Sequence, residues 1–449
     1  MKIIIAGAGE VGFHLAKLLS YESQNITLID SHKESLAYAD THLDIRVLKG
    51  DATSIAVLKD AGVDKSDLVI GVTSSETTNI TLCLLAKQLG CKRTIARISN
   101  TEFIDNKKAI NFSQLGIDEL ISPEELAATE IQLLLNQSAF NDTFEFEEGA
   151  LIIIGVSMPK SAPFIGKMVK EVAEIFPELH FMPIALQRKG TQFTLIPRGN
   201  TLFQAGDQVY FITTKTGVDE LYKLTGKQKK EMKNVMILGG SKVGFKTARD
   251  LCASRLNVKL IEKNKDKAFE LADDLPNALI INGDGRNVEL LEEESLESMD
   301  AFIAVTGNSE TNIMSCLMVK SKNNIKTIAL VENVDYFQLS HSIGIDTLIN
   351  KKLLAANNIF RYVRRGEVVA LTRLNNVNAE ILEFRVKVTS AVNGKAIRNL
   401  DFPQSATIGG VVRDGEGIIA LGGFEIREGD RVVVCCLPRA IPKIEKLFL

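Results

Sequence analysis

The sequence predicts a duplicated α/β protein in which two doubly wound parallel sheets are each followed by a small strand-rich module. Three observations lead to this fold class. Short apolar runs alternate with segments of helical period, a glycine-rich turn follows the first run of each half, and the pattern recurs about halfway along the 449 residues. Apolar runs of about four to six residues are typical of parallel strands that are buried on both faces.

The duplication shows first in two stretches, IIAGAGEVGF at residue 4 and MILGGSKVGF at residue 236. Gly7 and Gly239 are 239 − 7 = 232 residues apart, and further pairs keep nearly the same offset. The acids Asp30 and Glu262 correspond, as do KGDAT at 49 with NGDGR at 282 and SDLVIGVTSS at 66 with MDAFIAVTGN at 299. Matches that keep one register over several motifs indicate an internal repeat.

The stretches that follow each glycine-containing domain also resemble one another. PFIGKMVKEV at 163 resembles AVNGKAIRNL at 391, and TLFQAGDQVYFI at 201 resembles FEIREGDRVVVC at 424. The predicted order is a Rossmann-like domain, a small α+β module, and then both again. The predicted bounds are 1–135, 140–225, 233–363 and 367–449, and the charged join TGKQKKEMK reads as a solvated linker between the halves.

The elements expected in the first domain alternate along the chain. Strands are expected at the short apolar runs, residues 2–7, 25–30, 44–50, 67–73 and 93–98. Helices are expected where apolar residues recur three and four apart, as at 10–20 and 77–90. A last helix is expected over 122–135, because Ser122 and Glu125 have capping-box spacing and Pro123 takes the first helical position.

A glycine turn joins the first expected strand to the first helix. Gly7, Gly9 and Gly12 have the spacing that gives a tight turn, a close backbone approach to a pyrophosphate, and close packing of helix on sheet. Asp30 ends the next strand, can accept hydrogen bonds from an adenosine ribose, and would repel a 2′-phosphate. The set predicts a site for NAD(H) or an adenine nucleotide rather than NADP. The alternative is that the glycines serve turn geometry alone and Asp30 is a solvated strand end.

Other strand ends should complete this cleft. Asp51 follows the third strand and Thr73 and Ser74 follow the fourth, so all three belong to the carboxyl edge where such sheets bind ligands. Taken singly, each also suits a turn or a helix cap. Arg97 closes the fifth strand and is the cation placed to meet phosphate charge, with a surface salt bridge as the alternative.

The second half departs from this pattern at three positions. Ser241 replaces the middle glycine, which limits the backbone approach but offers a hydroxyl that could donate to phosphate. Lys242 adds a cation at the turn, and Leu330 stands where the first half has Arg97. Glu262 keeps the ribose acceptor, so the second cleft is expected to take a nucleotide with different affinity or selectivity. A purely structural copy is the alternative.

Composition argues against several other classes of function. The formal net charge is −3, which gives no broad electrostatic case for nucleic acid or an anionic membrane. Cysteines and histidines lack ligand spacing, so no metal site is expected, and no apolar run approaches the roughly 20 residues needed to cross a bilayer. The protein is therefore expected to be soluble by itself. A dehydrogenase would need an acid or base near the nicotinamide and an enclosing substrate domain, which the small modules do not suggest, so no catalytic residue is expected.

Two Rossmann-like units, each with G-x-(G/S)-x-x-G, a strand-end acid, GD after the third strand and VT after the fourth, closely resemble the TrkA family. Its members are cytoplasmic regulatory subunits of bacterial Trk potassium-uptake systems with tandem RCK/KTN and TrkA-C domains. The resemblance runs from Met1 to Leu449 and implies a nucleotide-sensing gating ring, a homotetramer with NAD(H) and ATP/ADP as ligands. It also implies docking under the membrane-embedded Trk channel subunit (TrkH/TrkG-like), at the inner face of the cell membrane.

Carried onto this chain, the resemblance implies two sets of nucleotide-binding residues. The first site would be lined by Gly7, Ala8, Gly9, Glu10, Val11, Asp30, Asp51, Thr73, Ser74 and Arg97. The second would be lined by Gly239, Gly240, Ser241, Lys242, Val243, Glu262, Asp284, Thr306 and Gly307. Regulation of a different potassium efflux or cation/proton transporter by the same fold is the nearer alternative function, and an NAD-dependent oxidoreductase is the other.

Overall fold

A computed structural model of the chain forms two compact units, and each unit combines parts of both halves. The first unit is Met1–Glu130 with Asn234–Val363, and the second is Ile131–Lys233 with Arg364–Leu449. The described residues are 1–449 except 21–23, 101, 107, 108, 137–141, 148, 176–179, 192, 226–231, 323, 324, 334, 335, 337–343, 364–367, 375, 376 and 449. Most of the expected linker therefore lies outside the described residues. The four expected domain bounds stay a prediction.

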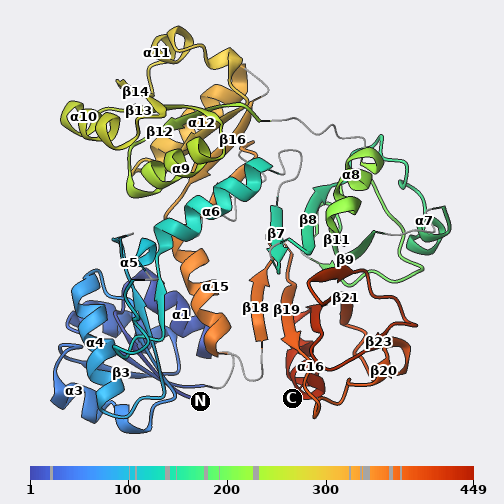
Figure 1. The fold of residues 1–449 in the computed structure, drawn as a ribbon, viewed down its shortest axis with the longest axis horizontal. Helices are drawn as coiled ribbons and strands as arrows, with labels where there is room; N and C mark the ends of the chain where they lie inside the picture. The colour runs from blue at the N-terminus through green and yellow to red at the C-terminus, as the bar shows by residue number, and fades with distance from the viewer. Residues whose placement is uncertain are drawn as a thin grey trace. The chain divides into compact units, whose positions relative to one another are not determined.

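The first sheet of unit 1 has the strand order β3-β2-β1-β4-β5-β6, and its described pairings are all parallel. Its strands are β1 (Lys2–Ala6), β2 (Asn25–Asp30), β3 (Arg46–Lys49), β4 (Leu68–Gly71), β5 (Arg93–Arg97) and β6 (Glu119–Ile121). Its helices are α1 (Glu10–Ser20), α2 (Lys33–His42), α3 (Ile55–Asp60), α4 (Glu76–Gln88), α5 (Glu102–Asp105) and α6 (Pro123–Asn136). Helices flank the sheet on both faces (Figure 1), so the central strand β4 is buried throughout and β1 is buried from Ile3 to Ala6.

The second sheet of unit 1 repeats this order as β14-β13-β12-β15-β16-β17, again parallel. Its strands are β12 (Asn234–Leu238), β13 (Asn257–Glu262), β14 (Ala278–Asn282), β15 (Ala301–Ala304), β16 (Lys326–Leu330) and β17 (Thr347–Ile349). Its helices are α9 (Lys242–Ala253), α10 (Lys265–Asp274), α11 (Val288–Glu293), α12 (Ser309–Lys322) and α15 (Lys351–Val363). The strand order reverses at the first strand in both sheets, which is the switch point where such folds bind ligands.

Each half of unit 1 sends its last helix to the other half. Helix α15, which follows the second sheet, packs along α1 of the first half. Helix α6 starts as expected, with the Ser122 hydroxyl accepting the amide of Glu125 at 3.2 Å. The Glu125 carboxylate then pairs with Lys246 of α9 at 3.1 Å. The two halves of unit 1 are therefore joined by exchanged helices.

Unit 2 contains two five-stranded antiparallel sheets, one two-stranded antiparallel sheet and small helices. The first has the order β10-β9-β11-β8-β7 and the second β18-β19-β24-β21-β22. The first module contains β7 (Asp142–Phe146), β8 (Leu151–Ser157), α7 (Val169–Ile175), β9 (Phe181–Gln187), β10 (Thr194–Leu195), β11 (Gln208–Thr213) and α8 (Lys215–Leu224). The second contains β18 (Val368–Arg373), β19 (Glu380–Arg385), β20 (Lys395–Ala396), β21 (Ala406–Arg413), β22 (Glu416–Ile418), β23 (Glu425–Ile426), β24 (Arg431–Cys436) and α16 (Ile441–Phe448).

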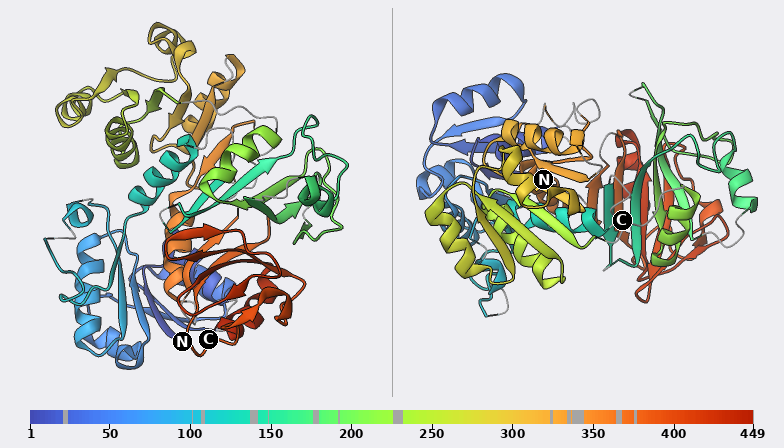
Figure 2. Two further views of the ribbon diagram at one scale, coloured as in Figure 1. Left: turned by 45° about the vertical axis from the view of Figure 1, so that its right-hand side comes forward. Right: turned by 90° about the horizontal axis from the view of Figure 1, so that it is seen from above.

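The two modules share one hydrophobic core. Ile153, Ile184 and Ile212 of the first module belong to the same buried cluster as Ile381 and Val433 of the second. A side chain at Gly409 would meet Ile184 and Ile212, so this glycine permits the close approach of the two sheets, which face one another in Figure 2. The expected fold class, two parallel sheets each followed by a small α+β module, is confirmed.

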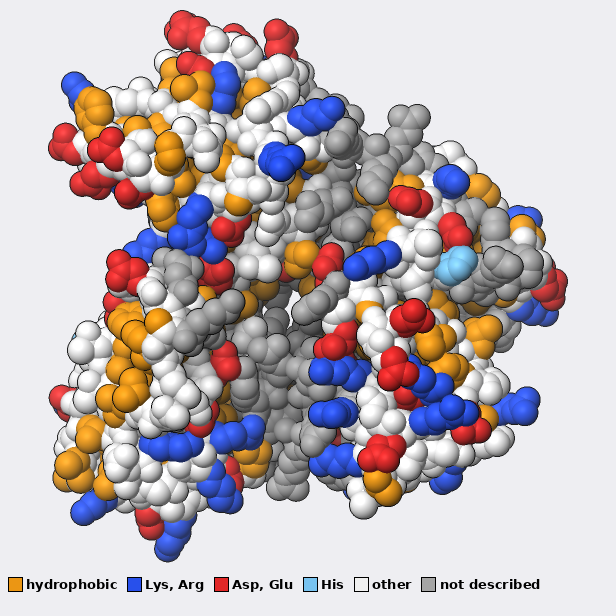
Figure 3. Space-filling model, viewed as in Figure 1, with side chains coloured by type: hydrophobic (Ala, Val, Ile, Leu, Met, Phe, Trp, Pro, Cys, Tyr) orange, Lys and Arg blue, Asp and Glu red, His pale blue; other side chains and the backbone are white. Residues whose placement is uncertain are grey.

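Surface charge is mixed on the face that Figure 3 shows, where acidic and basic side chains are interspersed. The mixture agrees with the small net charge of the sequence. That face carries no extended patch of one sign. Within the described residues, no helix has the length and apolar character that crossing a bilayer requires.

Candidate nucleotide-binding site

A cavity of about 570 Å³ lies at the carboxyl edge of the first sheet. The loops after β1 to β4 and the end of β5 line this cavity. It therefore lies at the switch point between β1 and β4. The residues expected at the first site that line it are Gly7, Gly9, Glu10, Val11, Asp30, Asp51, Thr73, Ser74 and Arg97. Ala8 lies in the same turn but is not part of the lining.

The three glycines of the first turn serve different needs. Gly7 has a φ of +109°, and a side chain there would lie 2.8 Å from the Thr73 amide nitrogen. A side chain at Gly12 would lie 1.8 Å from the carbonyl oxygen of Gly7, so helix α1 can start this close to β1 only with glycine. A side chain at Gly9 would meet nothing within 4 Å. Gly9 therefore leaves open space at the start of α1, and helix-start amides of this kind can bind an anion.

Asp30 at the end of β2 braces this turn. One carboxylate oxygen accepts the amide of Ala8 at 2.6 Å and the other accepts the amide of His32 at 2.8 Å. The His32 ring lies 3.0 Å from the same second oxygen. Burial raises the pKa of Asp30, but the hydrogen bonds from His32 and Ala8 outweigh it and hold the pKa below its ordinary value. Asp30 is therefore ionised at neutral pH and can still accept from a ribose hydroxyl.

Asp51, Thr73 and Asn79 show how the other loops are fixed. The Asp51 carboxylate accepts the amide and the hydroxyl of Thr53, both at 2.8 Å, and these bonds lower its pKa. The Asn79 side chain accepts the Thr73 amide and hydroxyl at 2.9 and 2.7 Å and donates to the carbonyl oxygens of Thr73 and Arg97. Asp51 thus has the turn role that was its alternative interpretation, while it also lines the cavity.

Arg97 supplies the most direct sign of an anion-binding site. Its Nε atom is buried and has no hydrogen-bond partner, although the side chain lines the cavity. A buried guanidinium nitrogen without an acceptor is costly, and a phosphate oxygen would satisfy it. The alternative interpretation of Arg97 as a surface salt bridge finds no support in the ion pairs of the described residues.

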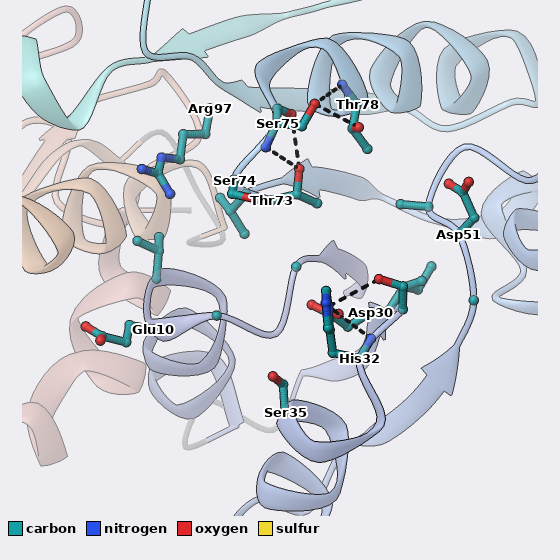
Figure 4. Close-up of a pocket in the computed structure, with 18 of the residues that line it drawn as sticks. Glu10, Asp30, His32, Ser35, Asp51, Thr73, Ser74, Ser75, Thr78 and Arg97 are labelled. Atoms are coloured by element: carbon teal, nitrogen blue, oxygen red, sulfur yellow. Dashed lines mark hydrogen bonds and ion pairs between the residues drawn. The ribbon is translucent and has the colours of Figure 1, made fainter.

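The cavity has two distinct ends (Figure 4). Asp30, His32 and Asp51 lie toward one end, and Glu10 and Arg97 lie toward the other, with Thr73 and Ser74 along the wall. Lys352 also lines the cavity and forms an ion pair with Glu10. Sequence reasoning missed Lys352, because it belongs to α15 of the second half and no local motif marks it. Ser31, Ser35, Ser75 and Thr78 were also missed and add hydroxyl groups to the lining.

The second half repeats the backbone geometry of the first. Gly239 has a φ of +102°, and the Gly240 amide donates to the Glu262 carboxylate at 3.0 Å. Asn312 holds the Thr306 amide and hydroxyl at 2.9 and 2.6 Å, as Asn79 holds Thr73. Among the remaining expected residues, Val243 is buried and a side chain at Gly307 would meet nothing within 4 Å.

Two of the residues expected at the second site already have hydrogen-bond partners within the protein. The Ser241 hydroxyl donates to the Val305 carbonyl oxygen at 2.6 Å and accepts the Gly244 amide at 3.2 Å. The Lys242 ammonium donates to the Ser99 carbonyl oxygen of the first half at 3.2 Å, and the side chain lines a cavity together with Gly240 of its own turn. Both side chains found partners outside the local motif.

The acids of the second half are neutralised by neighbouring cations. Asp284 pairs with Arg286 at 2.6 Å and with Lys263 at 3.1 Å, and the Arg286 bond above all holds its pKa well below the ordinary value. Glu262 has Lys267 at 3.7 Å. In the first half, Asp51 instead takes its bonds from the hydroxyl and amide of Thr53. The two halves therefore share the backbone geometry of the turn but differ in the charges around it.

Two family models each match both halves of the chain. The TrkA-N domain matches residues 3–123 and 235–351, and the TrkA-C domain matches residues 153–226 and 381–449. The chain belongs to the TrkA family. A Trk system potassium uptake protein TrkA homolog from Methanosarcina mazei is 32% identical, and the Haemophilus influenzae TrkA is 33% identical. Each alignment spans all of this chain and 100% and 98% of the relative, respectively.

Solved structures show the same fold at low sequence identity. The GsuK RCK domain has a TM-score of 0.61 at 16% identity, covering 99% of this chain and 94% of that chain. The GsuK channel bound to NAD has a TM-score of 0.62 at 16% identity, covering 99% of this chain and 78% of that chain. The predicted family is thus confirmed, as is the predicted function of a nucleotide-binding regulatory subunit in Trk-type potassium uptake.

Proposed function

We propose that the first cleft of this TrkA-family chain binds NAD(H), ATP or ADP through the residues gathered around Gly9. The observation that carries the proposal is the buried, unpartnered Arg97 Nε on the same cavity as the open space at Gly9 and the ionised Asp30. Asp30 receives the adenosine ribose and disfavours a 2′-phosphate. The α1 amides and Arg97 receive the phosphates.

The bound nucleotide is a signal and not a substrate. A general acid or base works best with a pKa near the operating pH. The pKa values of Asp30 and Asp51 are both lowered, so at neutral pH these groups hold no proton to donate and are weak bases. The two strand-end acids of the cavity therefore favour recognition of charge and shape over proton transfer, and we propose that the chain is not an enzyme.

The regulatory step is a shift between conformations. A ligand that binds one shape of the unit more tightly moves the population toward that shape. A coupling of about 1–3 kcal/mol gives roughly a 5- to 150-fold change in relative affinity. We propose that four copies form a cytoplasmic ring at the inner face of the membrane, and that a membrane-embedded Trk channel subunit responds to its shape. The names of the relatives, which refer to Trk potassium uptake, support this partner.

The second cleft is proposed to bind nucleotide more weakly than the first. Ser241 occupies the amide of Gly244 with its own hydroxyl, and Leu330 stands where the first half has Arg97. The Gly244 amide is thereby already hydrogen-bonded. The second half also lacks the guanidinium that could bind phosphate.

Calorimetric titration of the full chain with NADH, ATP and ADP tests the proposal. We expect Asp30→Ala to remove the tighter binding event and Glu262→Ala to affect only the weaker one. Incubation with each nucleotide, followed by product analysis, should return the nucleotide unchanged. Binding of none of the three at millimolar concentration, to protein with native circular dichroism, would overturn the proposal.

A further inference from the structure

The first cleft contains a cation that comes from the other half of the chain. Lys352 is the second residue of α15, which follows the last strand of the second sheet, yet its side chain lines the cavity of the first sheet. The side chain is only 18% exposed. Its ammonium pairs with Glu10 of α1 and with Glu332 of the second half, the latter at 3.1 Å.

The Glu10 carboxylate is a weakly held partner for this lysine. Its side chain is 66% exposed, so it can turn into water at small cost. At the first turn of α1 it also occupies the region of positive potential that attracts phosphate. A phosphate and Glu10 therefore compete for the same charge, and Lys352 has donors for either of them.

The position of this ion pair along the cavity indicates which phosphate it meets. Glu10 and Arg97 lie toward the end away from Asp30, which is the ribose acceptor (Figure 4). A nucleotide whose ribose is at Asp30 places its first phosphates at the Gly9 turn and any further phosphate toward Glu10. The pyrophosphate of a dinucleotide is esterified on both sides and carries no terminal phosphate, so it presents less charge at this end.

We propose that Lys352 binds the terminal phosphate of a nucleoside triphosphate in the first cleft and exchanges Glu10 for it. The inference rests on the proposed nucleotide function of this cleft. It makes Lys352 a specificity residue that distinguishes a triphosphate from a diphosphate and from a dinucleotide.

The origin of Lys352 gives the exchange a structural consequence. Helix α15 packs along α1, so a triphosphate at the start of α1 is held by both halves of unit 1. A diphosphate leaves Lys352 with Glu10. The contact between the two halves therefore changes with the number of phosphates on the bound nucleotide. A site built from the first half alone could not produce this change.

The test is calorimetric titration of the full chain with ATP and with ADP, each with the same magnesium concentration. We expect Lys352→Ala to weaken ATP binding about tenfold or more and ADP binding less than threefold. Lys352→Arg should restore most of the preference, since it keeps the charge. Glu10→Gln, which removes the competing carboxylate, should strengthen ATP binding.

Lys351→Ala is the matched control. Lys351 precedes Lys352 in α15 and pairs with Glu124 at 3.4 Å, but it does not line the cavity. It should leave the ATP to ADP affinity ratio unchanged. If the alanine variant does not fold, Lys352→Met takes its place in the titration, because it keeps the length of the side chain.

Equal weakening of ATP and ADP by Lys352→Ala would overturn the inference, as would the same loss of preference in Lys351→Ala, because either result means a role in helix packing alone. Failure of wild-type protein to bind ATP, ADP or NADH would instead overturn the proposed function beneath it.

Discussion

Asp30 accepts a hydrogen bond from the amide of Ala8 at 2.6 Å, so the acid that ends the second strand holds the turn that ends the first. Glu262 holds the Gly240 amide in the same way at 3.0 Å. The strand-end acid is thus a structural brace in both halves, whatever ligand it also meets. Substitution of either acid should therefore affect stability as well as binding.

Asp30→Asn should lower the stability of the protein in a pH-dependent way. Because the pKa of Asp30 is lowered in the folded protein, its ionised form stabilises the fold at pH values above the unfolded pKa of about 3.9. That contribution is lost as the pH falls through the folded pKa. We expect a deficit of about 1–2 kcal/mol at pH 7 that shrinks below about pH 4. Urea unfolding of both proteins across this range checks the sign, and a deficit that grew in acid would contradict it.

Gly9→Ala and Gly12→Ala should separate binding from folding. A methyl group at Gly12 would overlap the Gly7 carbonyl oxygen, so we expect a loss of about 2–4 kcal/mol and a clear fall in Tm. A methyl group at Gly9 points into open space, so stability should stay within about 1 kcal/mol while nucleotide affinity falls. Thermal unfolding of both variants tests the expected stabilities, and titration with ATP tests the expected affinities. Equal Tm values for the two variants would show that the turn differs from this geometry.

Asn79→Ala should loosen the phosphate end of the first cleft. Asn79 is buried and holds Thr73 and the carbonyl oxygen of Arg97, so its removal leaves these groups unpaired. We expect a stability loss of about 1–3 kcal/mol together with weaker nucleotide binding. Asn312→Ala removes the equivalent bonds of the second half and is the control. It should cost similar stability and leave the tighter binding event intact, so weakening of that event by both variants would argue against a local role.

Asp430→Ala should destabilise unit 2 strongly. The Asp430 side chain is 1% exposed and binds the Arg413 guanidinium through two contacts of 2.8 Å. Its loss leaves a partly buried cation without its partner, which typically costs about 3–5 kcal/mol. The double variant Arg413→Met/Asp430→Leu should recover much of the loss, because it removes both charges. Chemical unfolding followed by far-ultraviolet circular dichroism measures the difference, and a double variant no better than the single one would show that packing rather than charge is at stake.

The local parts of the first site were predictable from the sequence. The glycine turn and the acid at the next strand end are adjacent through the geometry of parallel strands, so their spacing alone places them together. The bracing role of Asn79 and Asn312 was not predictable, because it depends on bonds to the neighbouring strand ends at Arg97 and Leu330. The hydrogen bonds of Ser241 to Val305 and of Lys242 to Ser99 could not be predicted, because these partners are distant along the chain.

By itself the sequence determined that this protein is a duplicated α/β chain of the TrkA family with two glycine turns, because hydrophobic period and turn chemistry are local properties that need no partner. The tertiary structure alone decided which half completes which cleft. Helix α15 of the second half packs on α1 of the first and brings Lys352 to Glu10. That contact forms only when two helices that are far apart in the sequence meet in the folded chain, and nothing in the spacing of residues along the sequence specifies it.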